Sequence, residues 1–261
     1  MHKLLIFLTL FIVLLQQKNA TAQPFTKLVW SDEFNYKGLP DSKKWSYDTG
    51  GHGWGNNELQ YYTANKSKNA RVENGNLIIE AHKETIGKNL YSSARLVSKG
   101  KGEWKFGRID VSAKIPSGLG TWPAIWMLGS STPLKWPDDG EIDIMEHVGY
   151  DQDNIHASIH TKKYNHIQRT QKTDSIFVKN CNNSFHVYSV IWNEEHLTIL
   201  LDNQVYFHFN NDHTGNDAWP FNNPMHLLLN VTVGGFWGGL KGVNSSIFPK
   251  KMEIDYIRVY Q

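Results

Sequence analysis

Short runs of alternating apolar and polar residues, separated by turn residues, constrain the fold of this chain more than any other feature. In the run 104–115, the apolar residues Ile109, Val111 and Ala113 share one face, as expected for a half-buried antiparallel strand. We find no long amphipathic helix, no internal repeat and no linker. The pattern predicts an all-β fold in a single domain, a sandwich of antiparallel sheets, with a barrel as the alternative. Further strand-like runs follow at 155–160, 186–192, 196–201, 205–209, 225–233 and 252–260.

The first half of the chain gives a less regular pattern. Asn74, Gly75 and Asn76 form a turn signal before a buried strand, and Asp202-Asn203 forms a second one. Pro123 should confine the run 122–128 to a sheet edge, a strand start or a bulge. The segment 36–63 is predicted to form long loops. Three more strands are predicted at 27–30, 77–81 and 92–97.

Residues 1–22 resemble a secretory signal that precedes one domain over 23–261. His2 and Lys3 give a basic start, an apolar run follows to Leu15, and Ala20-Thr21-Ala22 is a typical cleavage site. A retained anchor is the alternative, although the run is short for a bilayer. We expect a secreted or periplasmic protein. With the single cysteine Cys181 it forms no internal disulfide.

The stretch Glu141-Ile142-Asp143-Ile144-Met145-Glu146 places three carboxylates in an apolar run. In a regular strand Glu141 and Asp143 share one face, but Met145 then takes the place where the third acid is expected. A β-bulge at Ile144-Met145 would return Glu146 to the acidic face. Three acids on one face repel one another, so folding alone gives no reason for this arrangement.

Such a cluster suits chemistry that needs one ionised and one protonated carboxyl, as in retaining glycoside hydrolysis. A solvated polar face and a metal site are the alternatives. His156 and His160 are four residues apart, on one strand face, and are candidate zinc ligands. Because no cysteine assists them, a hydrogen bond from His160 to substrate or to Asp143 is the favoured interpretation.

Aromatic residues are abundant, with ten Trp, eleven Tyr and twelve Phe. Flat rings stack on pyranose faces, and amides and carboxylates bind sugar hydroxyls. The loop 53–62 combines amides with aromatic rings, and Trp122 and Trp126 should share a strand face. The net charge of +2 argues against a nucleic-acid partner. A concave sheet with these residues around the acids would form a polysaccharide cleft.

Several segments, in this order, resemble laminarinase-like members of glycoside hydrolase family 16. The acidic stretch is similar to the E-x-D-x-x-E signature of that family, in the form with the extra bulge residue. The other matching segments are Trp30-Ser31-Asp32-Glu33-Phe34, 55–62, 122–128, 140–149 and 254–260. The resemblance implies a β-jelly-roll of two curved antiparallel sheets with a concave substrate cleft, and an endo-β-1,3-glucanase that acts with retention.

The resemblance also implies roles for individual residues. Glu141 would be the nucleophile, Glu146 the acid/base, and Asp143 would assist between them. Cleft-lining positions would be Asn57, Arg95, Trp122, Trp126 and His160, with Trp237 and Asn230 as weaker candidates.

Many family members hold a structural calcium ion on the convex side. The matching positions are the side chain of Asp255 and the main-chain carbonyls of Glu33 and Gly75, an oxygen-only set that suits Ca²⁺. No cofactor is expected for catalysis.

The substrate expected from the resemblance is β-1,3-glucan, with mixed-linkage β-1,3-1,4-glucan as a second possibility. Agar- or carrageenan-type galactan is the alternative within the same enzyme class. A glucan-binding module without catalysis is the alternative from another class. We expect a monomer with no membrane partner after removal of the signal.

Overall fold

The computed structural model describes residues 25–261, and the predicted signal segment lies outside the described residues. Within this range the chain folds into two β-sheets and one short 3-10 helix, η1 (Ser245–Ile247). Ten strands form the first sheet: β1 (Leu28–Asp32), β3 (Gln60–Tyr62), β4 (Ala70–Glu73), β5 (Asn76–Ile86), β6 (Asn89–Ser93), β9 (Gly107–Lys114), β14 (His186–Trp192), β15 (His196–Leu201), β16 (Gln204–Asn210) and β18 (Lys250–Tyr260). Eight form the second: β2 (Ser46–Asp48), β7 (Arg95–Val97), β8 (Glu103–Trp104), β10 (Thr121–Gly129), β11 (Glu141–Glu146), β12 (Asn154–His160), β13 (Lys172–Phe177) and β17 (Met225–Val233).

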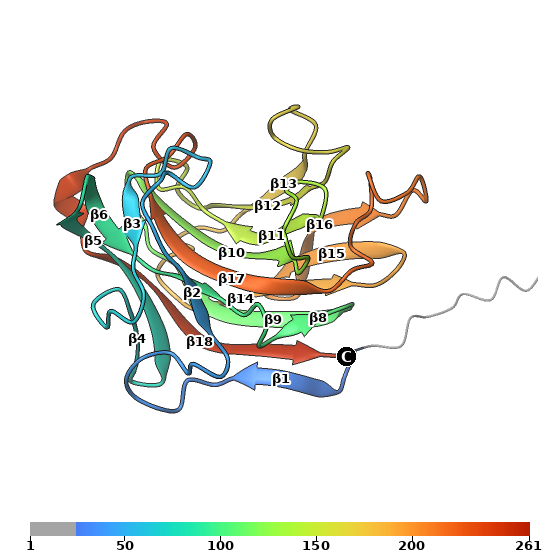
Figure 1. The fold of residues 1–261 in the computed structure, drawn as a ribbon, viewed down its shortest axis with the longest axis horizontal. Coiled ribbons are helices and arrows are strands. Elements are labelled where there is room, and N and C mark those ends of the chain that lie inside the picture. Colours follow the sequence, from blue (N-terminus) through green and yellow to red (C-terminus); the bar gives the residue numbers. More distant parts are fainter. Residues whose placement is uncertain (1–24) are drawn as a thin grey trace, which may run out of the picture.

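The two sheets lie face to face as curved layers (Figure 1). The eight-stranded sheet has the order β13-β12-β11-β10-β17-β7-β2, with β8 beside β17. The ten-stranded sheet has the order β16-β15-β14-β9-β18-β5-β6-β3, with β1 beside β18 and β4 beside β5. This confirms the predicted sandwich rather than a barrel. The acidic strand β11 therefore lies inside its sheet, between β10 and β12.

One continuous apolar core joins the two sheets. Ile109 and Val111 of β9 and Ile142 of β11 are fully buried in it, as is Leu229 of β17. The alternation in the sequence at 109–113 thus marks the inner face of the ten-stranded sheet, as predicted. Burial of such side chains stabilises the fold by about 1.5–3 kcal/mol each. The core fixes the inner side of β11, so its other side is left to face the cleft.

Local patterns predicted most strand positions, but some boundaries were wrong. The segment 92–97 is two strands, because the chain leaves the ten-stranded sheet after β6 and enters the other sheet as β7. The run 104–115 likewise divides between β8 and β9. The segment predicted as loops contains β2 and β3, whose partners β7 and β6 are distant in sequence. Neither β4 nor β13 was predicted, because β4 has only four residues and β13 is exposed along most of its length, so it lacks the apolar alternation of a half-buried strand.

The turn predictions are confirmed. Asn74 and Gly75 connect β4 to β5 with φ values of 53° and 77°, and Asp202 and Asn203 connect β15 to β16 with 49° and 67°. Positive φ at both central residues matches the twist of a two-residue hairpin. Pro123 lies near the start of β10, although that strand is paired on both sides. Among the described residues, no helix is long and apolar enough to cross a membrane.

Candidate active site

A bulge in β11 sets the direction of the three acids. In the pairing with β12, Asp143 lies opposite Ser158 and Glu146 lies opposite His156, so two residues of β11 occupy the space of one residue of β12. The two residues in the bulge, Ile144 and Met145, are both fully buried in the core. The predicted bulge is therefore present. It returns Glu146 to the cleft side, where Glu141, Asp143 and Glu146 line one cavity.

Two tryptophans hold the glutamates in place. The indole Nε1 of Trp136 donates a hydrogen bond to Glu141 Oε2 at 2.7 Å. The Nε1 of Trp122 donates to Glu146 Oε1 at 2.9 Å. In each glutamate the indole binds only one carboxylate oxygen, so Glu141 Oε1 and Glu146 Oε2 take no part in these hydrogen bonds. Trp122 comes from the neighbouring strand β10, and Trp136 from the loop that leads into β11, so the two glutamates have separate supports.

Asp143 and His160 form a charged contact between the glutamates. The Nε2 of His160 lies 3.3 Å from Asp143 Oδ2 and 3.7 Å from Glu141 Oε1. Asp143 is only 3% exposed, and its Oδ2 has no hydrogen bond of good geometry. Glu141, Asp143 and His160 are also the one group of His, Cys, Asp or Glu side chains, among residues 25–261, spaced closely enough to hold a metal ion.

The surroundings favour different protonation states for the two glutamates. Burial, and then the charge of Asp143, raises the pKa of Glu141 to about 7, while His160, the Trp136 hydrogen bond and Arg95 act in the opposite direction. Burial and Asp143 raise the pKa of Glu146 well above its usual range. Burial disfavours a charged His160, but the contact with Asp143 and the charge of Glu141 outweigh it and raise its pKa to about 9. A neutral Glu146 beside a more easily ionised Glu141 provides an acid and a nucleophile.

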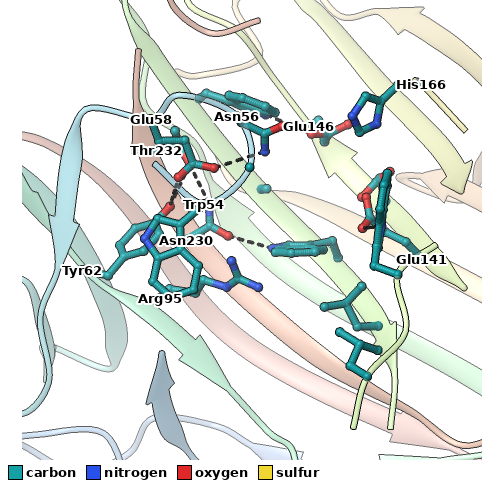
Figure 2. A pocket seen from close by; sticks show the side chains of 18 of the residues that line it. Trp54, Asn56, Glu58, Tyr62, Arg95, Glu141, Glu146, His166, Asn230 and Thr232 are labelled. Carbon is teal, nitrogen blue, oxygen red and sulfur yellow. Dashed lines mark hydrogen bonds between the residues drawn. The ribbon is translucent and has the colours of Figure 1, made fainter. Parts of the chain in front are cut away.

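The three acids line a cleft of about 480 Å³ on the face of the eight-stranded sheet that points away from the core (Figure 2). Its wall opposite Glu141 carries Glu58, Tyr62, Asn230 and Thr232. Apolar and aromatic side chains make up much of the rest, as expected for a site that binds sugar rings. The other residues with side chains in the lining are His52, Trp54, Asn56, Arg95, Trp122, Ala124, Trp126, Leu128, Leu134, Trp136, Asp143, Glu146, His166 and Ile167.

Arg95 places a buried positive charge in this cleft. Its guanidinium carbon lies 4.9 Å from the ring centroid of Trp54 and 4.5 Å from that of Trp126. Its Nε is 3.1 Å from Asp48 Oδ2. Contacts of a guanidinium with aromatic faces fix its plane as well as its position. The N–H donors of the Arg95 guanidinium are therefore held in a fixed orientation beside the rings of Trp54 and Trp126.

The structure brings most of the predicted site residues together. Arg95, Trp122, Trp126 and Asn230 line the cleft, and the shared face of the two tryptophans is confirmed. Asn57 does not line it. The backbone of Asn57 has a φ of 56°, and the residue lines a smaller neighbouring cavity of about 280 Å³, while Asn56 takes its expected place in the cleft.

The remaining predicted residues lie beside the acids rather than in the lining. His160 contacts Asp143 and Glu141, as favoured from the sequence. Trp237 packs edge-on against Trp122, with ring centroids 5.4 Å apart. The two candidate zinc ligands contact different acids. His160 contacts Asp143 and Glu141, whereas His156 Nε2 lies 3.1 Å from Asp151 Oδ2.

Several cleft residues were not assigned a role from the sequence. Trp136 holds Glu141, yet its position depends on the path of the loop between β10 and β11. Trp54, Glu58 and Tyr62 belong to the loop segment 53–62 that was predicted to bind ligand, although none of the three was singled out. Thr232 and His166 carried no local signal. Only the enrichment of amides and aromatic rings marked part of this set in advance.

The three positions considered for calcium lie at one corner of the ten-stranded sheet. Asp32 pairs with Ile257 and Leu77 pairs with Ile254, which brings Glu33 and Gly75 to the two sides of Asp255. Asp255 occupies an irregularity of β18, is exposed, and accepts one long hydrogen bond from Ser112, at 3.4 Å. Asp255 thus offers a carboxylate oxygen, which is the type of ligand that Ca²⁺ prefers.

Comparisons with known proteins agree with this geometry. The profile of the glycosyl hydrolases family 16 matches residues 57–258. The chain is 51% identical to a beta-glucanase of Rhodothermus marinus over 91% of this chain and 86% of the relative. The laminarinase structure from Rhodothermus marinus superimposes with a TM-score of 0.88 at 50% identity, over 90% of this chain and 97% of that one. A non-specific endo-β-1,3(4)-glucanase of the family, co-crystallised with 1,3-β-D-cellotriosyl-glucose, matches with the same TM-score and identity, over 90% and 94% of the two chains.

Proposed function

The chain belongs to glycosyl hydrolase family 16, and from this premise we propose that it is an endo-β-1,3-glucanase that cleaves with retention through Glu141 and Glu146. The observation that carries the proposal is the bulge in β11, which brings Glu146 to the same side as Glu141, in a cleft lined by aromatic side chains. The beta-glucanase and laminarinase named above support the substrate class. The oligosaccharide bound to a related glucanase supports a polysaccharide as the partner.

In the first step Glu146 donates its proton to the glycosidic oxygen while Glu141 attacks the anomeric carbon. The bond to the leaving sugar breaks, and a covalent glycosyl ester forms on Glu141. In the second step Glu146 removes a proton from water, the water oxygen attacks the anomeric carbon, and Glu141 leaves as a carboxylate. The product therefore keeps the β configuration.

Electrostatics let Glu146 serve as acid and then as base. The charge of Glu141 is one of the causes that raise the pKa of Glu146. That charge disappears when the ester forms, so the pKa of Glu146 falls at the step in which it must accept a proton. His160, with its raised pKa, stays charged and offsets the negative charge that remains on Asp143.

The proposal is tested by reducing-end release from laminarin, lichenan, agarose and κ-carrageenan, measured side by side. We expect release from laminarin above the other polysaccharides, with lichenan reporting on mixed-linkage cleavage. Cleavage of a galactan without cleavage of either glucan would overturn the substrate assignment. The variants Glu141→Gln and Glu146→Gln should keep the fold and lose turnover, and a normal rate in either would overturn the roles of the acids.

We further propose that residues 1–22 direct export and that the mature chain begins at Gln23. The basic start, the apolar run and the Ala20-Thr21-Ala22 segment support this proposal. Mass spectrometry of the protein recovered outside the cytoplasm should give Gln23 as the first residue. A protein that retains Met1, or that stays in the cytoplasm, would contradict it.

We also propose that Ca²⁺ binds between Asp255 and the main-chain carbonyls of Glu33 and Gly75, where it would link the end of β1, the start of β5 and the middle of β18 without entering the chemistry. The test is the melting temperature with Ca²⁺ and with a chelator, for the wild type and for Asp255→Asn. Ca²⁺ should raise the melting temperature of the wild type only. Finally, we propose a monomer, and light scattering in solution tests it.

A further inference from the structure

A second buried carboxylate lies in the cleft, away from the catalytic strand. Glu58 lines the cavity and is 8% exposed. It precedes β3, and the proposed chemistry makes no use of it. Burying a carboxylate is costly unless hydrogen bonds and charges compensate it. The contacts of Glu58 therefore indicate what it does.

One chain of hydrogen bonds leads from Trp126 toward Glu58. The indole N–H of Trp126 can only donate, and it donates to Asn230 Oδ1 at 2.7 Å. This fixes the amide of Asn230, whose Nδ2 donates to Thr232 Oγ1 at 3.1 Å. Thr232 must then pass its own hydrogen onward. Its two acceptors are the Tyr62 hydroxyl at 2.8 Å and Glu58 Oε2 at 3.4 Å.

A second chain reaches Glu58 from the other side. The backbone N–H of Val233 donates to Gln60 Oε1 at 2.9 Å, which fixes the amide of Gln60. The Nε2 of Gln60 then donates to Glu58 Oε2 at 2.6 Å. Asn56 Nδ2 donates to Glu58 Oε1 at 3.2 Å, and the Tyr62 hydroxyl donates to Oε2 at 3.3 Å. Both chains of hydrogen bonds therefore end at the carboxylate of Glu58, which accepts every bond that it makes in this group.

Only an ionised carboxylate accepts at both oxygens and donates at neither. Burial raises the pKa of Glu58 and outweighs the hydrogen bonds from Gln60 and Asn56 and the charge of Arg95, which lower it. The evidence for the charged form is therefore the direction of the hydrogen bonds, since donors point at both carboxylate oxygens. A glutamine here would point its amide hydrogens at groups that already donate. Glu58 therefore determines the polarity of the whole group, which we call the Glu58 network (Glu58, Gln60, Tyr62, Asn230 and Thr232). Figure 2 shows Glu58, Tyr62, Asn230 and Thr232 gathered on one wall.

We propose that Glu58 is a positioning residue that fixes the orientation of Trp126 and Asn230, and through them the binding of glucan along this wall of the cleft. The inference rests on the proposed function, because it takes the ligand to be a β-1,3-glucan. Trp126 lies on β10 opposite Asp143, and its ring is 4.5 Å from the Arg95 guanidinium carbon. Glu58 lies on the wall opposite Glu141, so its loss should weaken binding more than it slows chemistry.

The test compares kcat and KM on laminarin for Glu58→Gln, Thr232→Val and the double variant, with melting temperatures for each. Thr232→Val removes the hydroxyl that links Asn230 to Glu58, and it leaves the Glu58 side chain itself unchanged. We expect KM to rise about tenfold in either single variant, as for the loss of one oriented contact, with kcat within about twofold. The double variant should be no weaker than the worse single variant, because both break one network. Glu194→Gln, an exposed glutamate distant from the cleft lining, is the matched control.

Calorimetry of laminarioligosaccharide binding in a Glu141→Gln background gives the same comparison without turnover. A wild type that fails to cleave laminarin would overturn the proposed function. A wild type that cleaves laminarin, with an unchanged KM in Glu58→Gln, would overturn this inference alone. A lower kcat at unchanged KM would also overturn it. If Glu58→Gln does not fold, Thr232→Val decides, and an unchanged KM at wild-type melting temperature contradicts the proposal.

Discussion

Trp126 of β10 lies opposite Asp143, whereas Ala124, two residues earlier, lies opposite Glu146, three residues further along β11. The additional residue of β11 is what turns Glu146 toward the cleft. In a regular strand Met145 would face the cleft, and Glu146 would point into the apolar core. The arrangement of the active site thus depends on one irregularity in an otherwise ordinary strand.

The two indole hydrogen bonds predict that each tryptophan controls a different limb of the pH profile. Both stabilise a charged carboxylate, so removing either raises the pKa of its glutamate. Trp136→Phe should move the acid limb of kcat/KM, which reports ionisation of Glu141, upward by about one pH unit. Trp122→Phe should move the basic limb, which reports the proton on Glu146, upward by a similar amount.

Each tryptophan variant is the control for the other, because each should leave the second limb in place. Profiles of kcat/KM between pH 4 and 10 would be measured on laminarin, with circular dichroism as a check on folding. If Trp136→Phe shifted the basic limb and Trp122→Phe the acid limb, the roles of the two glutamates would have to be exchanged.

The charge of His160 should stabilise the folded state at low and neutral pH. Its pKa is raised from 6.5 to about 9, so the stabilisation is complete below pH 6.5 and is lost as the pH rises through 9. The full effect is up to about 3 kcal/mol. Urea unfolding of the wild type and of His160→Gln at pH 6 and pH 9.5 should show a difference that shrinks at the higher pH. A difference independent of pH would contradict the charged state.

His147 should have the opposite effect on stability. Its side chain is fully buried with both ring nitrogens unpaired, and burial lowers its pKa to about 4. A depressed pKa means that its contribution is present above pH 6.5 and is lost as the pH falls through 4, by up to about 3 kcal/mol. Thermal unfolding of His147→Leu should lose part of this acid sensitivity. His213→Gln, at an exposed position, should keep the wild-type pH dependence.

The sequence predicted those features of the site that depend on neighbours along the chain. Met145 interrupts the alternation of β11, and this alone indicated the bulge. The spacing of Trp122 and Trp126 placed both rings on one face for the same reason. The period of two residues is a local property of any strand, so such predictions need no knowledge of distant partners.

Features that depend on distant pairing were not predictable. Tyr62 and Thr232 are 170 residues apart and meet because the chain before β3 pairs with the chain at the end of β17, at Glu58 and Gly234. Likewise, Arg95 belongs to a separate strand because it pairs with Asp48 and Asn230, although the sequence continues without a turn signal. Asn57 was expected in the cleft, but its positive φ turns it aside and leaves Asn56 in that place.

The central claim is that Glu141 forms a covalent ester with the substrate, and peptide mass mapping tests it most directly. A laminaribioside with fluorine at C2 of the reacting glucose and a good leaving group should form the ester quickly and hydrolyse slowly, because the fluorine disfavours the oxocarbenium-like transition state. After digestion, the added mass should lie on Glu141, and Glu141→Gln should acquire none. Labelling of Glu146, or turnover of the probe with no covalent adduct, would contradict the account.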